Sequence, residues 1–254
     1  FWLRHYRPTN ATLALVGNFK TDEALASVTH WFSDVPDRGP VGARPVTPED
    51  ATNWPYRNGY LEDAVEDHTL AIAYRAPKLR TGDEAAVEVL SYLLSNGQGT
   101  RLDDPLYFNS NITNSIGTYY FAGDLEGLFV IFASTTTKPL KVVVKHVDKH
   151  LNALVKNPPT EEEVNRAQKA IRSYLLGRLE SPRSRANLLV DCYRYTENPN
   201  CLADDWARYE AVTPDDVLRV AETYLLNAQR TTLSVVPKGD ANSALAGATN
   251  VELP

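Results

Sequence analysis

The chain has 254 residues and a formal net charge of −6, from 26 Lys and Arg against 32 Asp and Glu. Its 43% hydrophobic and 23% charged residues are typical of a globular protein and exclude a disordered one. The mild acidity and scattered basic residues argue against a nucleic-acid-binding surface. No apolar run approaches the roughly 18 residues of a membrane span, so no spanning helix is predicted.

The start of the sequence is that of a piece of a longer polypeptide. The chain contains no Met, so Phe1 is not a translation start, and Phe1–Tyr6 resembles the interior of an amphipathic helix. A chain without its own beginning shows no signal peptide even where the gene encodes one. We therefore expect further residues upstream.

Two elements are predicted before a linker. Residues 11–17, Ala-Thr-Leu-Ala-Leu-Val-Gly, form an apolar run bounded by turn residues, which is typical of a buried strand. A helix is expected to begin at Thr21, with acidic side chains in its first turn and an apolar face that includes Leu25 and Trp31. Residues 37–55 are rich in Pro and Gly and lack periodicity, which predicts a linker.

After the linker, apolar periodicity predicts strands and helices in groups. Strands are expected at 56–65, 68–75, 115–122, 127–135 and 230–236. Helices are expected at 82–96, from 140 to the break at 157–159, at 160–179, 182–195 and 203–210, and from 213, with a short helix or turn at 100–108. Thr160–Glu163 reads as a capping box, and Thr213 followed by Pro214 as a helix start. Residues 239–254 read as a frayed tail.

This grouping predicts an α+β fold. Strands and helices do not alternate singly, which favours a mostly antiparallel sheet with helices packed on one face. The predicted organisation is therefore a first segment at 1–36, a linker at 37–55, a main domain at 56–238 and a tail at 239–254.

The two cysteines, Cys192 and Cys201, bracket a predicted turn at 198–200. A disulfide here would close a loop of about ten residues and contribute about 2.7 kcal/mol in the chain-entropy model. It would also imply an oxidising compartment. The alternative is a pair of reduced thiols at adjacent helix ends.

One spacing is of the metal-binding kind. His146 and His150 stand four residues apart and would share a helix face. The zinc peptidase versions of this spacing need a Glu beside one His, and those positions hold Val147 and Lys149. We interpret the two histidines as solvated, with His150 partly covered. The acidic pair Asp103-Asp104 could contact a cation or a basic peptide.

No other catalytic pattern is present in the sequence. There is no G-x-S-x-G, and the Gly-rich stretch 97–100 lacks the following Lys of a phosphate loop, so it reads as a helix stop. Residue chemistry alone thus indicates a scaffold or binding unit without catalytic or metal-binding residues.

Several segments carry a family resemblance. Residues 5–19 (HYRPTNATLALVGNF), 90–102, 124–129 (DLEGLF), 160–169, 206–209 and 212–217 follow one another in the order and spacing of pitrilysin-type (insulinase-type) zinc metallopeptidases. The chain resembles this family over about residues 1–237, and in particular its second, non-zinc domain. The resemblance implies that residues 1–36 are the last strand and helix of an upstream, homologous zinc-type domain.

The resemblance also implies where the chemistry lies. The family binds zinc through H-x-x-E-H and a later Glu in the first domain, so no zinc ligand or general base is expected on this segment. Second-domain partners often supply an Arg and a Tyr that position the peptide. An alignment from Arg101 places Tyr107 and Asn114 at those two positions. Neither can replace the Arg or Tyr, because Tyr107 lacks a bidentate cation and Asn114 is not a phenol.

The function implied is that of the inactive second part of a zinc metalloendopeptidase, which completes a clamshell chamber around an extended peptide substrate. The partners expected are the upstream zinc-binding domain and a second homologous subunit that carries the Arg/Tyr pair. A periplasmic or other extracytoplasmic location is expected. The alternative is a non-enzymatic scaffold subunit derived from the same family.

Overall fold

The computed structural model describes residues 1–36, 39, 42 and 57–251, so most of the predicted linker lies outside the described residues. The chain divides into two compact units, one of residues 1–46 and 172–207 and one of residues 47–171 and 208–254. This division differs from the predicted domains, because residues 172–207 belong with the N-terminal segment. Their buried residues Leu188, Cys192 and Cys201 form a separate small cluster with Leu179 and Leu202.

The larger unit is built on a six-stranded sheet in the order β3-β4-β2-β5-β1-β6. The strands are β1 (Arg57–Asp63), β2 (His68–Ala76), β3 (Ser115–Ala122), β4 (Gly127–Thr135), β5 (Arg230–Pro237) and β6 (Thr249–Asn250). The pairs β3–β4, β4–β2 and β2–β5 are antiparallel, whereas β5–β1 and β1–β6 are parallel. The sheet is therefore mixed, with antiparallel pairing through its first four strands.

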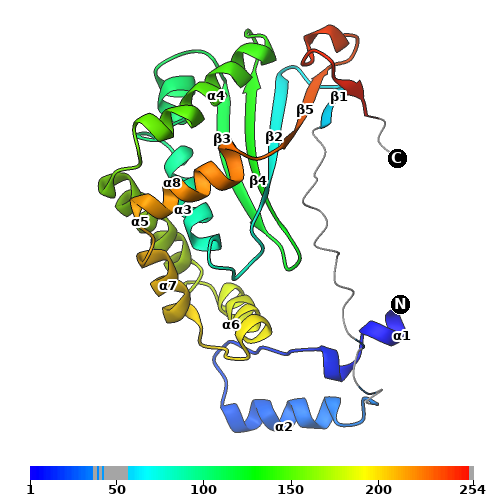
Figure 1. Ribbon diagram of the computed structural model, residues 1–254. Coiled ribbons are helices and arrows are strands. Elements are labelled where there is room, and N and C mark those ends of the chain that lie inside the picture. The colour runs from blue at the N-terminus through cyan, green and yellow to red at the C-terminus, as the bar shows by residue number, and fades with distance from the viewer. Residues whose placement is uncertain (37–38, 40–41, 43–56, 252–254) are drawn as a thin grey trace. The chain divides into compact units, whose positions relative to one another are not determined.

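Helices cover one face of this sheet, which confirms the predicted α+β class. They are α3 (Glu84–Leu94), α4 (Leu140–Lys156) and α8 (Pro214–Ala221), together with the π-helical turns η2 (Asp104–Phe108) and η3 (Glu222–Leu226). Figure 1 shows α3, α4 and α8 on the same side of the strands. Along β2, Leu70, Ile72 and Tyr74 alternate toward these helices and are fully buried.

The predicted helix starts have the contacts expected of capping boxes. Helix α5 (Glu161–Gly177) begins after Thr160, whose backbone N–H donates to Glu163 Oε2 at 2.9 Å, while the Glu163 N–H donates to Thr160 Oγ1 at 3.3 Å. At α8, Thr213 and Asp216 make the same reciprocal pair, with Pro214 at the first helical position. These bonds satisfy backbone N–H groups that the helix leaves free.

The smaller unit contains α1 (Trp2–His5), the 3₁₀ turn η1 (Pro8–Asn10), α2 (Thr21–Phe32), α6 (Pro182–Thr196) and most of α7 (Leu202–Glu210). The predicted helix from Thr21 is confirmed. The predicted strand at residues 11–17 is not formed. A strand needs a neighbour for its backbone hydrogen bonds, and none of the described residues pairs with this apolar run.

The expectation of a frayed tail is wrong for residues 239–251. These residues contain a 3₁₀ turn, η4 (Ala241–Ser243), and strand β6, which pairs with Gly59 and Tyr60 of β1. The Val251 N–H also donates to the Tyr60 carbonyl at 2.8 Å.

Among the described residues, none of the helices has the length and hydrophobicity that a membrane span requires.

Candidate functional site

The larger unit holds a cavity of about 370 Å³ between α3 and the edge strand β3. Its lining is Glu88, Ser91 and Tyr92 on α3, Ser95, Asn96 and Gly97 directly after that helix, Asp103, and the consecutive residues Ile116–Phe121 on β3. The cavity thus combines carboxyl and hydroxyl groups with several aromatic rings. Its volume is near the lower end of the range of about 300–1,000 Å³ typical of ligand pockets.

The hydroxyl groups on the cavity wall join α3 to β3. Ser91 Oγ donates to the Thr118 carbonyl at 3.2 Å, and Thr118 Oγ1 donates to the Ser91 carbonyl at 2.7 Å. Ser95 Oγ donates to Asp103 Oδ1, and the Gly97 N–H donates to Asp103 Oδ2 at 2.6 Å. The Asp103 carboxylate therefore holds the Gly-rich turn in place. This structural role accounts for an acidic residue that the sequence analysis considered as a contact for a cation or a basic peptide.

Glu88 differs from these groups. Its side chain is half-buried on α3, and within the described residues its carboxyl makes no hydrogen bond or ion pair. Burial, and secondarily the neighbouring Glu84, raises the pKa of Glu88 to about 7. Glu84 itself is paired, since it accepts hydrogen bonds from the Arg80 N–H at 2.7 Å and from the Arg208 guanidinium.

Sequence reasoning missed Glu88 because a single Glu on an amphipathic helix usually faces water. A weak signal was available in the pattern of α3. Glu88 stands between the buried Val87 and Val89, on a helix whose other positions are mostly apolar. A charged residue near the buried stripe of a helix needs either a partner or a ligand.

The two residues that the sequence alignment predicts at the family's Arg and Tyr positions lie in different local structures. Tyr107 lies in η2, is 46% exposed, and packs edge-on against Phe108 at 4.8 Å between ring centroids. Asn114 precedes β3, where its Nδ2 donates to Asp67 Oδ2 at 3.2 Å and to Thr136 Oγ1. Neither side chain lines the cavity between α3 and β3.

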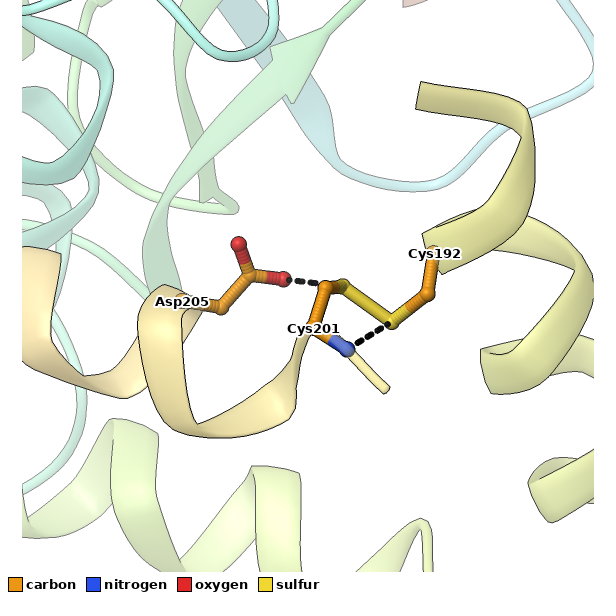
Figure 2. A group of neighbouring side chains, drawn as sticks. All are labelled: Cys192, Cys201 and Asp205. Carbon is orange, nitrogen blue, oxygen red and sulfur yellow. Dashed lines mark hydrogen bonds between the residues drawn. A yellow bond between two sulfur atoms is a disulfide. The ribbon is translucent and has the colours of Figure 1, made fainter. Parts of the chain in front are cut away.

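The two cysteines of the smaller unit are joined in the structure. Cys192 near the end of α6 and Cys201 before α7 form a disulfide and are both almost fully buried. Figure 2 shows the Asp205 carboxylate directed at Cys201, with its Oδ2 3.2 Å from the Sγ atom. These three residues form the one group of three metal-ligand side chains found among the described residues. Disulfide sulfurs are not thiolates, so this group does not fit a catalytic zinc.

The histidines with metal-type spacing lie on α4. His146 and His150 are both half-buried. The side chain of His146 is therefore less exposed than predicted. Burial, followed by the positive charge of Lys149 and by His146, lowers the pKa of His150. Neither histidine belongs to a group of three possible metal ligands within the described residues.

Comparison with known proteins identifies the family. A family model described as "Peptidase M16 inactive domain" matches residues 1–171. The chain belongs to this family. The match confirms the resemblance to pitrilysin-type zinc metallopeptidases that the sequence motifs suggested.

Two curated relatives of this M16 chain are named as zinc proteases. The zinc protease PqqE of Helicobacter pylori is 21% identical over 239 residues, which are 92% of this chain and 53% of the relative. An uncharacterized zinc protease of Streptomyces coelicolor is 25% identical over 239 residues, 93% of this chain and 52% of the relative. The chain thus spans about half the length of the curated relatives it matches.

Solved structures show the same fold. A protease from Helicobacter pylori has a TM-score of 0.73 at 20% identity, over 87% of this chain and 54% of that one. A peptidase M16 inactive domain from Pseudomonas fluorescens has a TM-score of 0.72 at 20% identity, over 87% and 52%. The periplasmic protease PqqL from Escherichia coli has a TM-score of 0.62 at 16% identity, over 87% and 25%.

Proposed function

We propose that this M16 chain is the non-catalytic second part of a zinc metalloendopeptidase and that it completes a peptide-binding chamber formed with an upstream domain. The match of residues 1–171 to the M16 inactive-domain model is the observation on which the proposal rests. The matched residues include the N-terminal segment and most strands of the sheet. A single family model therefore covers residues of both compact units.

The N-terminal segment supports a missing neighbour. None of the residues 1–36 is buried in the structure, although the segment contains many large apolar side chains. On α2, Trp31 is 74% exposed and Leu25 is 63% exposed, and no described residue pairs as a strand with the apolar run at 11–17. Exposed apolar surface of this kind marks an interaction site. We infer that residues 1–36 supply the last strand and helix of an upstream zinc-type domain.

Zinc then belongs to the upstream domain. The group formed by Cys192, Cys201 and Asp205 does not fit the metal, so no step of the hydrolysis is assigned to this chain. Zinc bound upstream would supply an activated water. The substitutions at Tyr107 and Asn114 leave this chain without the family's Arg/Tyr pair, and a second homologous subunit would provide it.

An extracytoplasmic location accompanies this proposal. The disulfide between Cys192 and Cys201 is of the kind that persists in oxidising compartments. A protein of similar fold, PqqL, is described as periplasmic. These observations favour the periplasm.

The test is to express the full-length gene product and measure cleavage of a set of unstructured fluorogenic peptides. Zinc-dependent cleavage that a chelator abolishes and added zinc restores is expected, in the presence of a homologous subunit where one is encoded. The present chain alone should cleave nothing. If the full-length protein cleaves no peptide in the presence of zinc, either alone or with a homologous subunit, the proposal is overturned and the scaffold alternative remains.

A further inference from the structure

The cavity between α3 and β3 contains a carboxyl group, that of Glu88, with no countercharge among the described residues. Among the described residues that line it there is no Lys or Arg. The other lining carboxylate, Asp103, is occupied by Ser95 and Gly97, and the nearby Glu84 is occupied by Arg208. Glu88 is left with neither a hydrogen bond nor an ion pair in the described part of the chain.

A half-buried carboxyl group without a partner is unfavourable for folding once it is ionised, since burial removes its hydration. A ligand cation would replace that lost hydration by a charge-assisted hydrogen bond. Aromatic rings add a second attraction, because the face of an aromatic ring attracts ammonium and guanidinium groups. Tyr92 on α3 and Tyr120 on β3 contribute such rings to the cavity wall, and Tyr120 is close enough to interact electrostatically with Glu88.

The form of the cavity favours one end of a longer molecule. Six consecutive residues of β3, Ile116–Phe121, line it, and β3 is the terminal strand of the sheet order. An extended chain can follow such a strand edge and direct a side chain into the cavity. A small free amine would use the carboxyl group but gain nothing from the strand.

We propose that this cavity binds the cationic end of a Lys or Arg side chain of an extended peptide, with the Glu88 carboxylate as its charge partner. The choice of a peptide as the ligand rests on the proposed function. This chain would then favour peptides that carry a basic residue at one position. The inactive domain would determine that position, whichever peptide bond the enzyme cleaves.

The test uses the full 254-residue chain and two short probes. One probe is an acetylated, amidated pentapeptide with a central Lys between alanines, and the other has norleucine in place of that Lys. Binding is measured by titration calorimetry at pH 8, where Glu88 is ionised. The Lys peptide is expected to bind at least tenfold more tightly than the norleucine peptide. A difference of less than twofold, or no binding of either probe, would overturn the proposal.

Two variants assign the effect to Glu88. The Glu88→Gln variant keeps the shape of the side chain and removes its charge, and it should lose the preference for Lys. The matched control is Glu66→Gln, because Glu66 is exposed and does not line the cavity, and it should retain the full preference. A preference that survives in Glu88→Gln would also contradict the proposal.

A free diamine, cadaverine, separates the two sources of an ammonium group. Weaker binding of cadaverine than of the Lys peptide supports the peptide source, and equal or tighter binding overturns it. None of these measurements depends on proteolysis. Failure of this proposal is therefore distinguishable from failure of the proposed protease function.

Discussion

Arg101 and Glu163 form a paired contact between the Gly-rich turn and the first turn of α5. Arg101 Nε donates to Glu163 Oε1 at 2.6 Å and its Nη2 donates to Oε2 at 2.7 Å. The same guanidinium donates to the carbonyl groups of Asn157 and Pro158. One side chain thereby joins the end of α4, the start of α5 and the segment after α3.

The Arg101→Ala substitution should destabilise the protein by about 2–4 kcal/mol. The substitution leaves the mostly buried Glu163 carboxylate without its main partner, and removal of one member of such a pair is costly. Urea unfolding measures the loss. Lys20→Ala is the control, because the Lys20–Glu23 pair is largely exposed and should contribute no more than about 0.5 kcal/mol. Equal effects of the two substitutions would contradict this account.

The Arg101–Glu163 pair also predicts an acid dependence. Burial alone would raise the pKa of Glu163, but the hydrogen bond and charge of Arg101, with help from Thr160, lower it below its usual 4.5. A carboxyl group with a lowered folded-state pKa stabilises the protein above its unfolded value, and that contribution is lost as the pH falls through the folded value. The difference in stability between wild type and Arg101→Ala should therefore shrink below about pH 4.5. A constant difference from pH 7 to pH 3 would contradict this.

Much of the larger unit could be predicted from local sequence. The strands at 115–122 and 127–135 and the capping residues Thr160 and Thr213 follow from alternation and cap chemistry, which act over a few residues. The strand expected at 11–17 does not form among the described residues, because a strand also needs a partner strand, and a local apolar run does not encode one. The sequence also did not predict that β6 pairs with β1, because a strand of two residues is too short to show a hydrophobic period.

The candidate site was less predictable than the fold. The cavity depends on the distance between α3 and β3, which no local pattern encodes. The environment of Glu88 depends in turn on which neighbouring acids are neutralised, and Glu84 is paired with an Arg 124 positions away. Only the tertiary structure shows that Glu88 has no such partner among the described residues.

Glu88→Gln should stabilise the protein at alkaline pH. The pKa of Glu88 is about 7 in the folded state against 4.5 for the usual side chain, so the folded protein holds this proton more tightly than the unfolded chain does. Stability is therefore lost as the pH rises from about 4.5 through about 7. The difference of 7 − 4.5 = 2.5 pH units corresponds to at most about 3 kcal/mol at pH 8.5.

Urea unfolding of wild type and Glu88→Gln at pH 4.5 and pH 8.5 checks this expectation. The variant should match the wild type at the lower pH and exceed it at the higher pH. The charged and titratable groups around Glu88, namely Glu84, Asp103, Arg208 and the phenols of Tyr92, Tyr119 and Tyr120, are unchanged in both proteins, so their titration cancels in the comparison. A gain of equal size at both pH values would show that ionisation of Glu88 is not its cause.

The disulfide should stabilise the small cluster around α6. Closing the nine-residue separation between Cys192 and Cys201 is worth about 2.7 kcal/mol in the chain-entropy model. We expect the intact mass of the purified chain to rise by about 2 Da on reduction, as a disulfide takes up two hydrogens. The double variant Cys192→Ser/Cys201→Ser should lose about 2–3 kcal/mol and become insensitive to reductant. An unchanged mass on reduction would show that the thiols were already free.

The apolar face of α2 should matter for assembly and little for the stability of this chain. Trp31 and Leu25 are mostly exposed, so the double substitution Leu25→Ser/Trp31→Ser should change the free energy of unfolding by less than about 0.5 kcal/mol. In the presence of the upstream half, expressed as a separate polypeptide, the same substitution should weaken association at least tenfold, because buried Trp side chains dominate interfaces.

Val155→Ser is the matched control, since Val155 is an exposed apolar residue on α4, in the larger unit. It should leave association with the upstream half unchanged. Sedimentation or calorimetry of the mixed halves measures the effect. If both variants associate as tightly as the wild type, residues 1–36 do not complete an upstream domain. The exposed apolar side chains of α2 would then require a different partner.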